Sequence, residues 1–396
     1  MLNLAFFNAI LKEDYLGPIR DQLNNATIML QRLKRNEEDV GGRIASVPLH
    51  TGRNSGVGAR ADGGNLPAAG RQGYNTAQYL CAYNYGRIQV TGPTIAASRK
   101  DKYAFVKAVD SEIKGMVKDL KDDLNRQLFG DRSGIMALCT VANGAGAATF
   151  TVDNPQYIQT GMIIDNMTGV AAPVRFTRTV TAVNRVTGVV TVSVVYAGAA
   201  DVAIGDAIVR SGNFGLEMMG LLGIVNDANT RDGQFVGALD RTLAANGFWD
   251  ANVLANGGVA RNLTLDLMQQ GFDASEIEGG EVSLITTSYA QRRRYLALVK
   301  ADGRFVNNLK MDGGWDALDY NGKPLVVDRH MLPGMIYFLD EKTLELYRMS
   351  DFDWMDEDGS VLSRVAGVDA YEATLFKYAT LGCSACNNNT VIQDLA

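Results

Sequence analysis

The side chains that could perform catalytic chemistry are few in this sequence. There are two histidines, His50 and His330, and no sequence signature pairs either of them with a nucleophile. A serine hydrolase needs a serine, a histidine and a carboxylate in one constellation, and the G-x-S-x-G motif of a strand–turn–helix nucleophile does not occur. The histidines therefore do not predict a catalytic triad.

Three short motifs resemble metal or nucleotide sites, and each lacks a residue that the chemistry requires. The run CSAC (383–386) is a single C-x-x-C, whereas a zinc site needs a second pair or nearby histidines. In GKP (322–324), proline replaces the Ser or Thr of a phosphate-binding loop. In WMDEDG (354–359), tryptophan stands where a calcium loop begins with aspartate. We therefore predict no catalytic, cofactor-binding or metal-binding residue, and we interpret the two cysteines as ordinary small residues.

The basic residues favour contacts with other chains. Segment 53–75, RNSGVGARADGGNLPAAGRQGYN, has no apolar periodicity and cannot build a core, yet it contains Arg53, Arg60 and Arg71. Strand-like runs flank it, GRIASVPLHTG before and AQYLCAYNYGRIQVTG after, so we predict a long basic loop on a two-stranded stalk. The RRR run at 292–294 lies on an expected helix without interleaved aromatic residues, which favours a solvated or intersubunit face over DNA readout.

Length and composition indicate an ordinary globular protein. The chain has 396 residues, of which 46% are apolar and 21% charged, enough for two or three domains. A net charge of −6 argues against a dedicated nucleic-acid-binding module. Four cysteines are too few for a disulfide framework, so a reducing cytoplasm during synthesis is the simplest assumption. No apolar run is long enough to span a membrane, and the N-terminus lacks the features of a secretory leader.

Two segments have the apolar spacing of helices. Residues 16–33 place apolar side chains at alternating steps of three and four, which predicts a helix that packs on this chain or on a neighbour. Residues 98–129 continue the same spacing over a longer span, with Ser98 in the N-cap position. At 1.5 Å per residue the second helix would be roughly 45 Å long, which suits the support of an extended molecule.

The middle of the chain is rich in strands. Residues 147–210 consist of short Val/Thr runs separated by Gly/Asn turns, which predicts a small inserted β-barrel or sandwich. Beyond residue 216 the pattern is mixed. There we expect helices at 263–274 and 288–300, and strands at 281–287, 323–328, 334–340, 343–349 and 370–385.

The order of these elements resembles a known family. The run LKDDLNRQLFGDRSGI (120–135) resembles the end of the spine helix in major capsid proteins of tailed bacteriophages with the HK97-like fold. The run YNGKPLVVDRHMLPGMIYFLDEKTLELYR (320–348) resembles the apical domain of the same family, and RSGNFGLEMMGLLGIVND (210–227) after the β-rich insert is similar to some members. The resemblance covers most of the chain by element order.

This resemblance implies an α+β fold of the HK97-like capsid type. Its parts would be an N-terminal arm with a helix, an extended β-hairpin loop, a spine helix with a peripheral domain, an inserted small β-rich domain, an apical domain, and C-terminal strands that return to the peripheral and apical domains. In this sequence they would occupy, in that order, residues 1–42, 43–92, 93–146, 147–210, 211–350 and 351–396.

The resemblance also implies a function and partners. The chain would be a structural subunit, without enzymatic activity, that assembles as hexamers and pentamers into an icosahedral shell around the double-stranded DNA genome of a tailed phage. Its location would be the virion, after assembly in the cytoplasm of a host bacterium. A scaffolding protein, a portal, a decoration protein and DNA held non-specifically on the inner face are the family's other partners, and no membrane partner is expected. Because the arm begins close to Met1, we expect no N-terminal scaffolding segment within the chain.

In this family the loop before the spine helix lies across a neighbouring subunit, and the N-terminal arm also contacts a neighbour. The resemblance therefore implies two groups of intersubunit contact residues. They are Arg53, Asn54, Arg60, Arg71 and Tyr74 in the extended loop, and Leu16, Leu23 and Leu30 in the arm.

Three other interpretations stay open at this level. An encapsulin-type bacterial compartment shell shares the fold and would differ in its packaged content. An α+β enzyme could use Asp328 and Asp340 as strand-end carboxylates, although the scarcity of histidine counts against it. A tail-tube or tail-fibre subunit would suit the β-rich insert but not the long helix.

Overall fold

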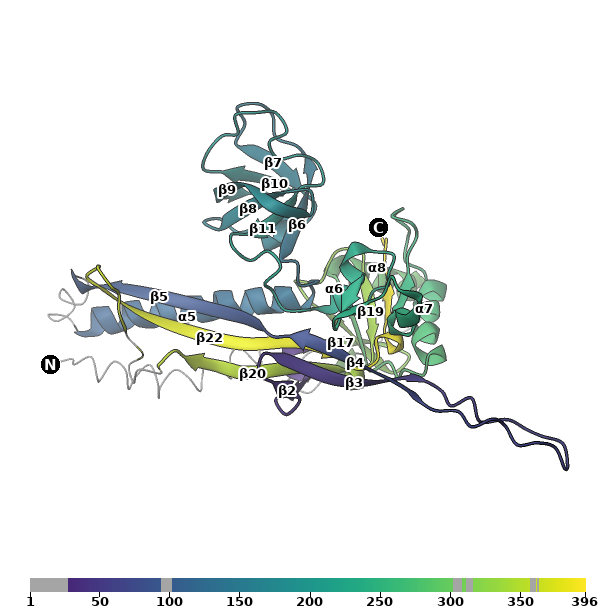
Figure 1. Ribbon diagram of the computed structural model, residues 1–396. Helices are drawn as coiled ribbons and strands as arrows, with labels where there is room; N and C mark the ends of the chain where they lie inside the picture. The colour runs from purple at the N-terminus through teal and green to yellow at the C-terminus, as the bar shows by residue number, and fades with distance from the viewer. Residues whose placement is uncertain (1–27, 94–101, 302–307, 311–315, 357–360, 362) are drawn as a thin grey trace.

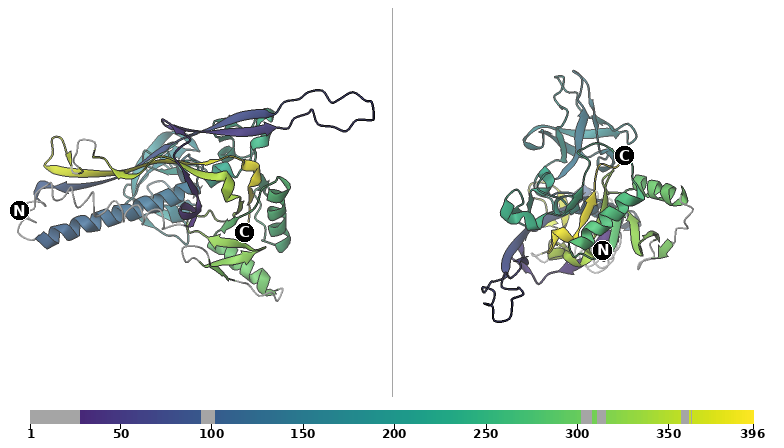
Figure 2. Two further views of the ribbon diagram at one scale, coloured as in Figure 1. Left: turned by 90° about the horizontal axis from the view of Figure 1, so that it is seen from below. Right: turned by 90° about the vertical axis from the view of Figure 1, so that its right-hand side faces the viewer.

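The computed structural model shows an elongated molecule with two projections (Figure 1). A long helix and a sheet extend toward one end, and a body built on a mixed sheet lies at the other. A small barrel stands above their junction, and a narrow hairpin extends from the body, as the views in Figure 2 also show. The described residues are 28–93, 102–301, 308–310, 316–356, 361 and 363–396.

A five-stranded sheet forms the elongated half. Its central strand, β22 (Ala370–Cys383), pairs antiparallel with β5 (Ala82–Thr91) and with β20 (Leu344–Trp354). Strand β1 (Lys34–Asn36) pairs parallel with β20, and β21 (Ser363–Arg364) pairs with β22. The long strand expected at 370–385 is present, and it joins the C-terminal part of the chain to β5, a segment from its first quarter.

Helix α5 (Lys102–Leu128) lies along this sheet (Figure 1). Helix 98–129 is confirmed over this range, whereas its expected N-cap, Ser98, lies outside the described residues. Apolar side chains at steps of three and four residues bury one face of the helix in the core: Ile113, Val117, Leu120 and Leu124.

The body is built on a seven-stranded mixed sheet in the order β14-β23-β19-β15-β18-β17-β16. Helices α7 (Leu265–Ile277) and α8 (Tyr289–Ala301) share a core with one face of the sheet, where Phe338 is buried. Tyr337, the next residue along β19, belongs to the main core on the other face, so both faces are covered. The strands are β14 (Asn252–Leu254), β15 (Leu284–Thr287), β16 (Asn308–Lys310), β17 (Asp316–Tyr320), β18 (Lys323–Val327), β19 (Ile336–Leu339) and β23 (Thr390–Ile392).

A closed six-stranded barrel stands apart from these layers, with its own hydrophobic core (Figure 1). The β-rich unit expected at 147–210 therefore begins too late. Strand β6 pairs with both β7 and β11, and without it the barrel would have two open edges. The strands are β6 (Ile135–Val141), β7 (Thr149–Val152), β8 (Ile163–Thr168), β9 (Ala171–Val183), β10 (Val189–Val192) and β11 (Ala207–Arg210).

The narrow projection is a hairpin of β3 (Ile44–Gly52) and β4 (Gly73–Leu80), with β2 (Val40–Gly41) paired to β3. The predicted stalk is present, but its return run divides at Cys81. The Cys81 amide donates to the Arg43 carbonyl at 3.0 Å, and the chain then continues as β5 in the five-stranded sheet. The range 43–92 thus contains a hairpin and a separate strand.

The boundary expected between residues 350 and 351 falls inside β20. This strand keeps its pairing with β22 through register shifts at Arg348/Ser350 and Ser350/Asp353, so the chain does not leave the sheet there. The division into peripheral and apical domains stays a prediction.

No described helix is long and apolar enough to cross a membrane. The remaining elements are α3 (Ile28–Arg32), α6 (Leu221–Ile224), β12 (Phe235–Val236), β13 (Leu239–Asp240) and the 3-10 turns η2 (Pro155–Tyr157), η3 (Arg231–Gly233), η4 (Ala244–Trp249), η5 (Glu341–Thr343) and η6 (Cys386–Asn388).

Candidate functional site

The base of the hairpin is firmly packed. Alternate residues of β3 and β4 are buried in the main core, as expected for a hairpin that packs one of its two faces on the core. The Tyr79 hydroxyl donates to the Cys383 carbonyl at 3.0 Å, and its ring stacks on Tyr347 with centroids 6.3 Å apart. The direction in which the loop leaves the body is therefore set by core contacts.

The loop beyond this base, residues 53–72, has no such cover. Its two large aliphatic side chains, Val57 and Leu66, are 86% and 87% exposed. The loop holds its shape with local bonds: the Gly56 amide donates to Asn54 Oδ1 at 2.7 Å, and Arg60 Nε donates to the Asn65 carbonyl at 3.1 Å. These bonds shape the loop without giving it a core.

The expected contact residues of the loop divide into two kinds. Arg53, Arg60 and Arg71 are exposed, and none forms an ion pair with a carboxylate of the described chain. Tyr74 is 74% exposed, and its ring meets the edge of His50, with centroids 5.5 Å apart. Asn54 instead turns inward, so its side-chain oxygen is already used within the loop.

The contact residues expected in the N-terminal arm are Leu16, Leu23 and Leu30. Leu16 and Leu23 lie outside the described residues. Leu30 is in α3 and is only 4% exposed, in the same core as the rest of the main body. The expectation that Leu30 contacts a neighbour is therefore wrong, because its own subunit encloses the side chain.

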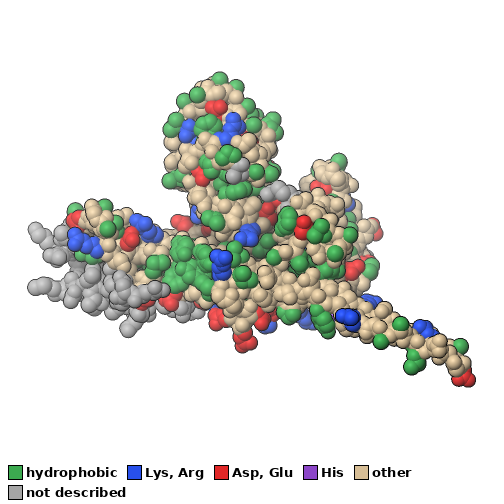
Figure 3. Space-filling view, in the orientation of Figure 1, with side chains coloured by type: hydrophobic (Ala, Val, Ile, Leu, Met, Phe, Trp, Pro, Cys, Tyr) green, Lys and Arg blue, Asp and Glu red, His purple; other side chains and the backbone are tan. Residues whose placement is uncertain are grey.

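A second exposed surface lies on the outer face of the five-stranded sheet, away from α5. Tyr83 and Tyr85 of β5 contact Tyr378 of β22, with ring centroids 5.0 and 5.8 Å apart, and Phe376 lies 4.9 Å from Tyr378. Tyr83 and Tyr85 are 45% and 52% exposed. Hydrophobic side chains gather on this part of the molecule, below the barrel (Figure 3). Sequence reasoning missed this aromatic face because it depends on the register between β5 and β22.

The barrel joins the body through a buried polar cluster. The Tyr157 hydroxyl donates to the His330 carbonyl, and Asn125 Nδ2 lies 2.7 Å from His330 Nδ1 and 2.9 Å from Asp328 Oδ1. Burial lowers the pKa of His330 to about 4, and the neighbouring Arg329 charge adds to the effect. The neutral imidazole is thus a structural acceptor at the junction.

A charged cluster lies beside this junction. Arg126 of α5 forms ion pairs with Asp123 and Glu217, and Arg210 at the end of β11 lies 3.7 Å from Asp123. Burial alone would raise the pKa of Asp123, but the charges of the two arginines outweigh it and lower the pKa. The aspartate therefore stays ionised and joins the end of the barrel to the long helix.

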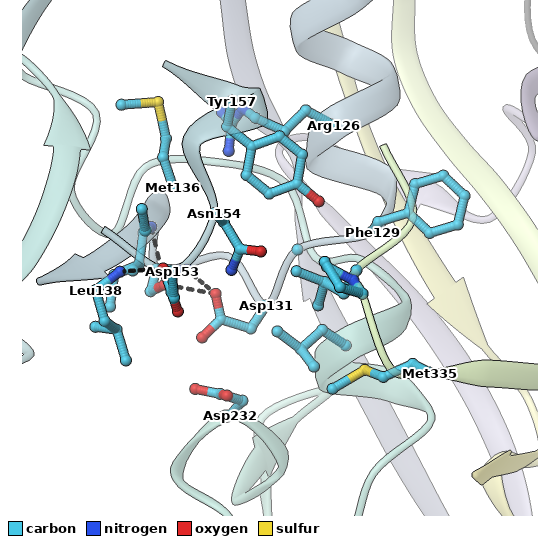
Figure 4. Close-up of a pocket in the computed structure, with 17 residues that line it drawn as sticks. Arg126, Phe129, Asp131, Met136, Leu138, Asp153, Asn154, Tyr157, Asp232 and Met335 are labelled. Atoms are coloured by element: carbon cyan, nitrogen blue, oxygen red, sulfur yellow. Dashed lines mark hydrogen bonds between the residues drawn. The ribbon is translucent and has the colours of Figure 1, made fainter. Parts of the chain in front are cut away.

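A cavity of about 420 Å³ lies between the barrel and the body (Figure 4). Three carboxylates, those of Asp131, Asp153 and Asp232, line it together with apolar side chains such as Phe129 and Met335. The Leu138 amide donates to Asp153 at 2.8 Å, and Ser133 donates to Asp131. Within the described ranges no group of three or more His, Cys, Asp or Glu side chains is placed to hold a metal. The Ser133 amide also donates to Asp131 at 3.0 Å, so this serine and aspartate bond each other within the turn that follows α5.

Comparisons with known proteins reveal the fold. No family model matches the chain, and a comparison with curated proteins found no relative. The capsid asymmetric unit of cyanophage A-1(L) superposes with a TM-score of 0.57 over 93% of this chain and 93% of that chain, at 13% identity. The chain has the fold of a phage capsid protein. The α+β, HK97-like fold expected from the sequence is confirmed at this level.

Two further solved structures are more distant. The capsid of an empty GTA particle gives a TM-score of 0.48 at 11% identity, covering 93% of this chain and 96% of that chain. The holo-SrpI encapsulin complex from Synechococcus elongatus PCC 7942 gives 0.46 at 10% identity, covering 93% of this chain and 86% of that chain.

In this capsid fold, the strand-end carboxylates of the enzyme interpretation have structural partners. Asp328 accepts hydrogen bonds from Asn125 and from the His330 amide, at 2.9 and 2.8 Å. Asp340 is 4% exposed and accepts from the Lys342 amide at 3.1 Å, which caps η5. Neither residue lines the cavity between barrel and body.

The short motifs also have structural explanations in the capsid fold. The Gly of GKP, Gly322, follows Asn321 in a tight hairpin turn between β17 and β18, with φ of 73° and 50°. The basic run lies on α8, where Arg292 stacks over Tyr289 at 5.5 Å and Arg294 donates to Asn262. Part of WMDEDG lies outside the described residues.

Proposed function

We propose that this chain is a structural shell subunit that self-assembles into the icosahedral capsid around the double-stranded DNA genome of a tailed phage. The observation that carries the proposal is the likeness to the cyanophage A-1(L) capsid, which extends over 93% of both chains. The elongated body and the projecting loop support it, because both leave surface that a neighbouring subunit can cover. The subunit acts by contact and not by catalysis.

The projecting loop is the element of the subunit that contacts a neighbour. Ordering a chain segment costs about 1 to 2 kcal/mol per residue of backbone entropy, and the local bonds of residues 53–72 recover only part of that cost. A partner surface supplies the rest. Charge-assisted hydrogen bonds from Arg53, Arg60 and Arg71 contribute about 1.5 to 3 kcal/mol each.

The outer aromatic face is the surface that suits this loop. Arginine guanidinium groups stack favourably on tyrosine rings, and Val57 and Leu66 match an apolar floor. Within one chain the loop extends away from the aromatic face, which lies below the barrel (Figures 1 and 3). The loop of one subunit therefore covers the aromatic face of the next in a head-to-tail arrangement, which closes into rings of five or six.

The other partners and the location of the chain follow from the proposal that it builds a shell. Hexamers and pentamers build the particle in the host cytoplasm, and the particle is the virion capsid. The barrel stands on the outer face, where an inserted unit meets the fewest neighbours. A scaffolding protein, a portal and a decoration protein complete the particle, and DNA lies non-specifically against the inner face.

The test is electron microscopy of the purified chain, with analysis of what the particles contain. We expect closed shells or rings of five and six, and in phage particles double-stranded DNA. A monodisperse monomer at micromolar concentration in light scattering contradicts assembly. Shells that enclose an enzyme and no genome would assign the chain to the encapsulin class instead.

A further inference from the structure

Cys383 and Cys386 are neighbouring thiols inside the main core. Cys383 ends β22, Cys386 begins η6, and each is 0% exposed. The side chains of Cys383 and Cys386 interact with each other, the Cys383 sulfur also lies 3.8 Å from Thr343 Oγ1, and both are free cysteines. Two thiols in contact across two intervening residues have the spacing of a reversible disulfide.

A buried arginine makes the two thiols unequal. The Arg241 side chain is fully enclosed, lies beside Cys386 and is 3.8 Å from the Asp250 carboxylate, which opposes part of its charge. It also donates to four backbone carbonyls, those of Gly223, Ile224, Asn226 and Gly233. Burial alone would raise the pKa of Cys386, but the hydrogen bond from Cys383 and the Arg241 charge outweigh burial and lower it. Burial and the contact with Cys386 raise the pKa of Cys383. Cys386 is thus the cysteine whose thiol ionises first as the pH rises.

A hollow at the surface leads toward this pair. A pocket of about 280 Å³ is lined by the turn that separates the two cysteines, at Ser384 and Ala385, and by the base of the hairpin, at His50 and Arg53. The exposed guanidinium of Arg53 places a positive charge among the lining groups. Such a pocket suits a small disulfide that carries carboxylates.

We propose that Cys383 and Cys386 form a redox pair, which closes to an intramolecular disulfide when the protein meets a small anionic disulfide such as glutathione disulfide. The Cys386 thiolate attacks one sulfur of the oxidant, forms a mixed disulfide and releases one glutathione thiolate. Cys383 then loses its proton and attacks the Cys386 sulfur, which releases the second glutathione thiolate. Two protein thiols are oxidised, and one glutathione disulfide is reduced to two glutathione molecules.

The bond would join the end of β22 to η6 and so to β23, at the point where the carbonyl of Cys383 accepts from Tyr79 of the hairpin. Because both sulfurs are enclosed, the oxidant reaches Cys386 only when the turn at Ser384 and Ala385 moves aside, so closure is slow while Arg241 stays in place. Because the closed ring is short, the gain in thermal stability is small. Closure of the disulfide therefore requires an oxidising medium and a subunit whose Arg53 pocket is not covered by a neighbour.

The sequence allows the proposal to be tested on the intact 396-residue chain. No Lys or Arg follows Lys377, so trypsin releases residues 378–396 as one peptide that holds both cysteines and no other. After equilibration with glutathione disulfide, alkylation and digestion, we expect this peptide to carry no alkyl group. Its mass should be lower by two hydrogens than the mass of the reduced, unmodified peptide. Cys81 and Cys139, which are buried singly, should be alkylated in full. A doubly alkylated 378–396 peptide at equilibrium, or mixed glutathione adducts without closure, would overturn the proposal.

Two matched variants test the order of attack. Cys383→Ala should accumulate a glutathione adduct at Cys386, whereas Cys386→Ala should form the adduct at Cys383 at least about tenfold more slowly. Equal rates, or the reverse order, would show that Arg241 does not select the attacking sulfur. The wild-type peptide assay stands by itself if either variant fails to fold, and Cys81→Ser serves as the control that should close the disulfide normally.

Discussion

The barrel and the projecting loop both extend from the same body, but only one of them stabilises itself. The barrel closes its hydrogen-bond ladder and encloses side chains such as Phe150, Val190 and Tyr196 in a core of its own. The loop, residues 53–72, exposes Val57 and Leu66 and has only local hydrogen bonds. A projection with a core can fold as a unit, whereas a projection without one depends on a second surface.

This difference predicts opposite effects of substitution. Changes in the barrel core should alter the stability of the barrel and leave assembly intact. Changes in the loop should leave the subunit stable and alter assembly.

The largest effect should come from the loop arginines. Replacing Arg53, Arg60 and Arg71 together with alanine removes up to three charge-assisted contacts, so particle yield in electron microscopy should fall by well over tenfold. The circular dichroism spectrum of the subunit should be that of wild type. Its free energy of unfolding should stay within about 0.5 kcal/mol of wild type, because all three side chains are exposed. Normal shells at normal yield would refute the intersubunit role, and a loss of fold would place the loop in its own subunit's core.

The next effect concerns the barrel core. Phe150 is 2% exposed and packs edge-on against Tyr196, with centroids 6.3 Å apart. Phe150→Ala should lower the free energy of barrel unfolding by about 3 to 5 kcal/mol in chemical denaturation, while shells still form. Phe235, which is 62% exposed in the body, offers a control whose change to alanine should cost less than about 0.5 kcal/mol. Failure of the whole subunit to fold would show that the barrel is not independent.

The attachment of the barrel should depend on pH. His330 has a folded pKa of about 4, below its unfolded value of about 6.5, so the unfolded state binds the proton more readily. Stability is therefore complete above pH 6.5 and declines as the pH falls toward 4, by up to about 3 kcal/mol. The raised pKa of buried Asp328 acts in the opposite direction, so the comparison must be made against His330→Gln.

Denaturation of both proteins at pH 7 and pH 5 measures this contribution. The wild type should lose more stability than His330→Gln over that interval. An equal loss in the two proteins would show that His330 is protonated in the folded state or is not enclosed.

The smallest effect is expected from substitutions at the tips of the two projections, and it distinguishes the two projections most directly. Leu66 in the loop and Val186 in the barrel turn are 87% and 95% exposed. Leu66→Ser should weaken assembly by about 1 to 2 kcal/mol per contact, because in the proposed shell a neighbour buries this side chain. Val186→Ser should change neither assembly nor unfolding by more than about 0.5 kcal/mol. Dissociation of shells in denaturant, followed by light scattering, measures both, and equal effects would remove the distinction between the projections.

Local patterns predicted the elements of this fold well. The apolar steps of α5 and the alternation of β3 are properties of neighbouring residues, and the same side chains that produce them are buried in the structure. The start of the barrel could not be predicted in this way. Strand β6 belongs to the barrel because of its pairing with β11, about 70 residues later, and such register is not visible in local periodicity.

The candidate site shows the same limit. The sequence identified a coreless loop with exposed arginines, because composition alone determines that a Gly/Ala-rich segment lacks apolar cover. It could not identify what covers Leu30, since an apolar stripe indicates a buried face but not which surface buries it. It also could not reveal the aromatic face, where Tyr83 and Tyr378 meet only through strand pairing.

The closed barrel has a consequence for engineering. The chain enters it on β6 and leaves it on β11, and these two strands are paired antiparallel neighbours, with Ile135 opposite Val209. The two connections to the body are therefore about 5 Å apart, the spacing of one strand pair. Any foreign domain whose own termini lie side by side could be grafted at this position without stretching the body. The same arrangement would allow one inserted domain to be exchanged for another while the body keeps its geometry.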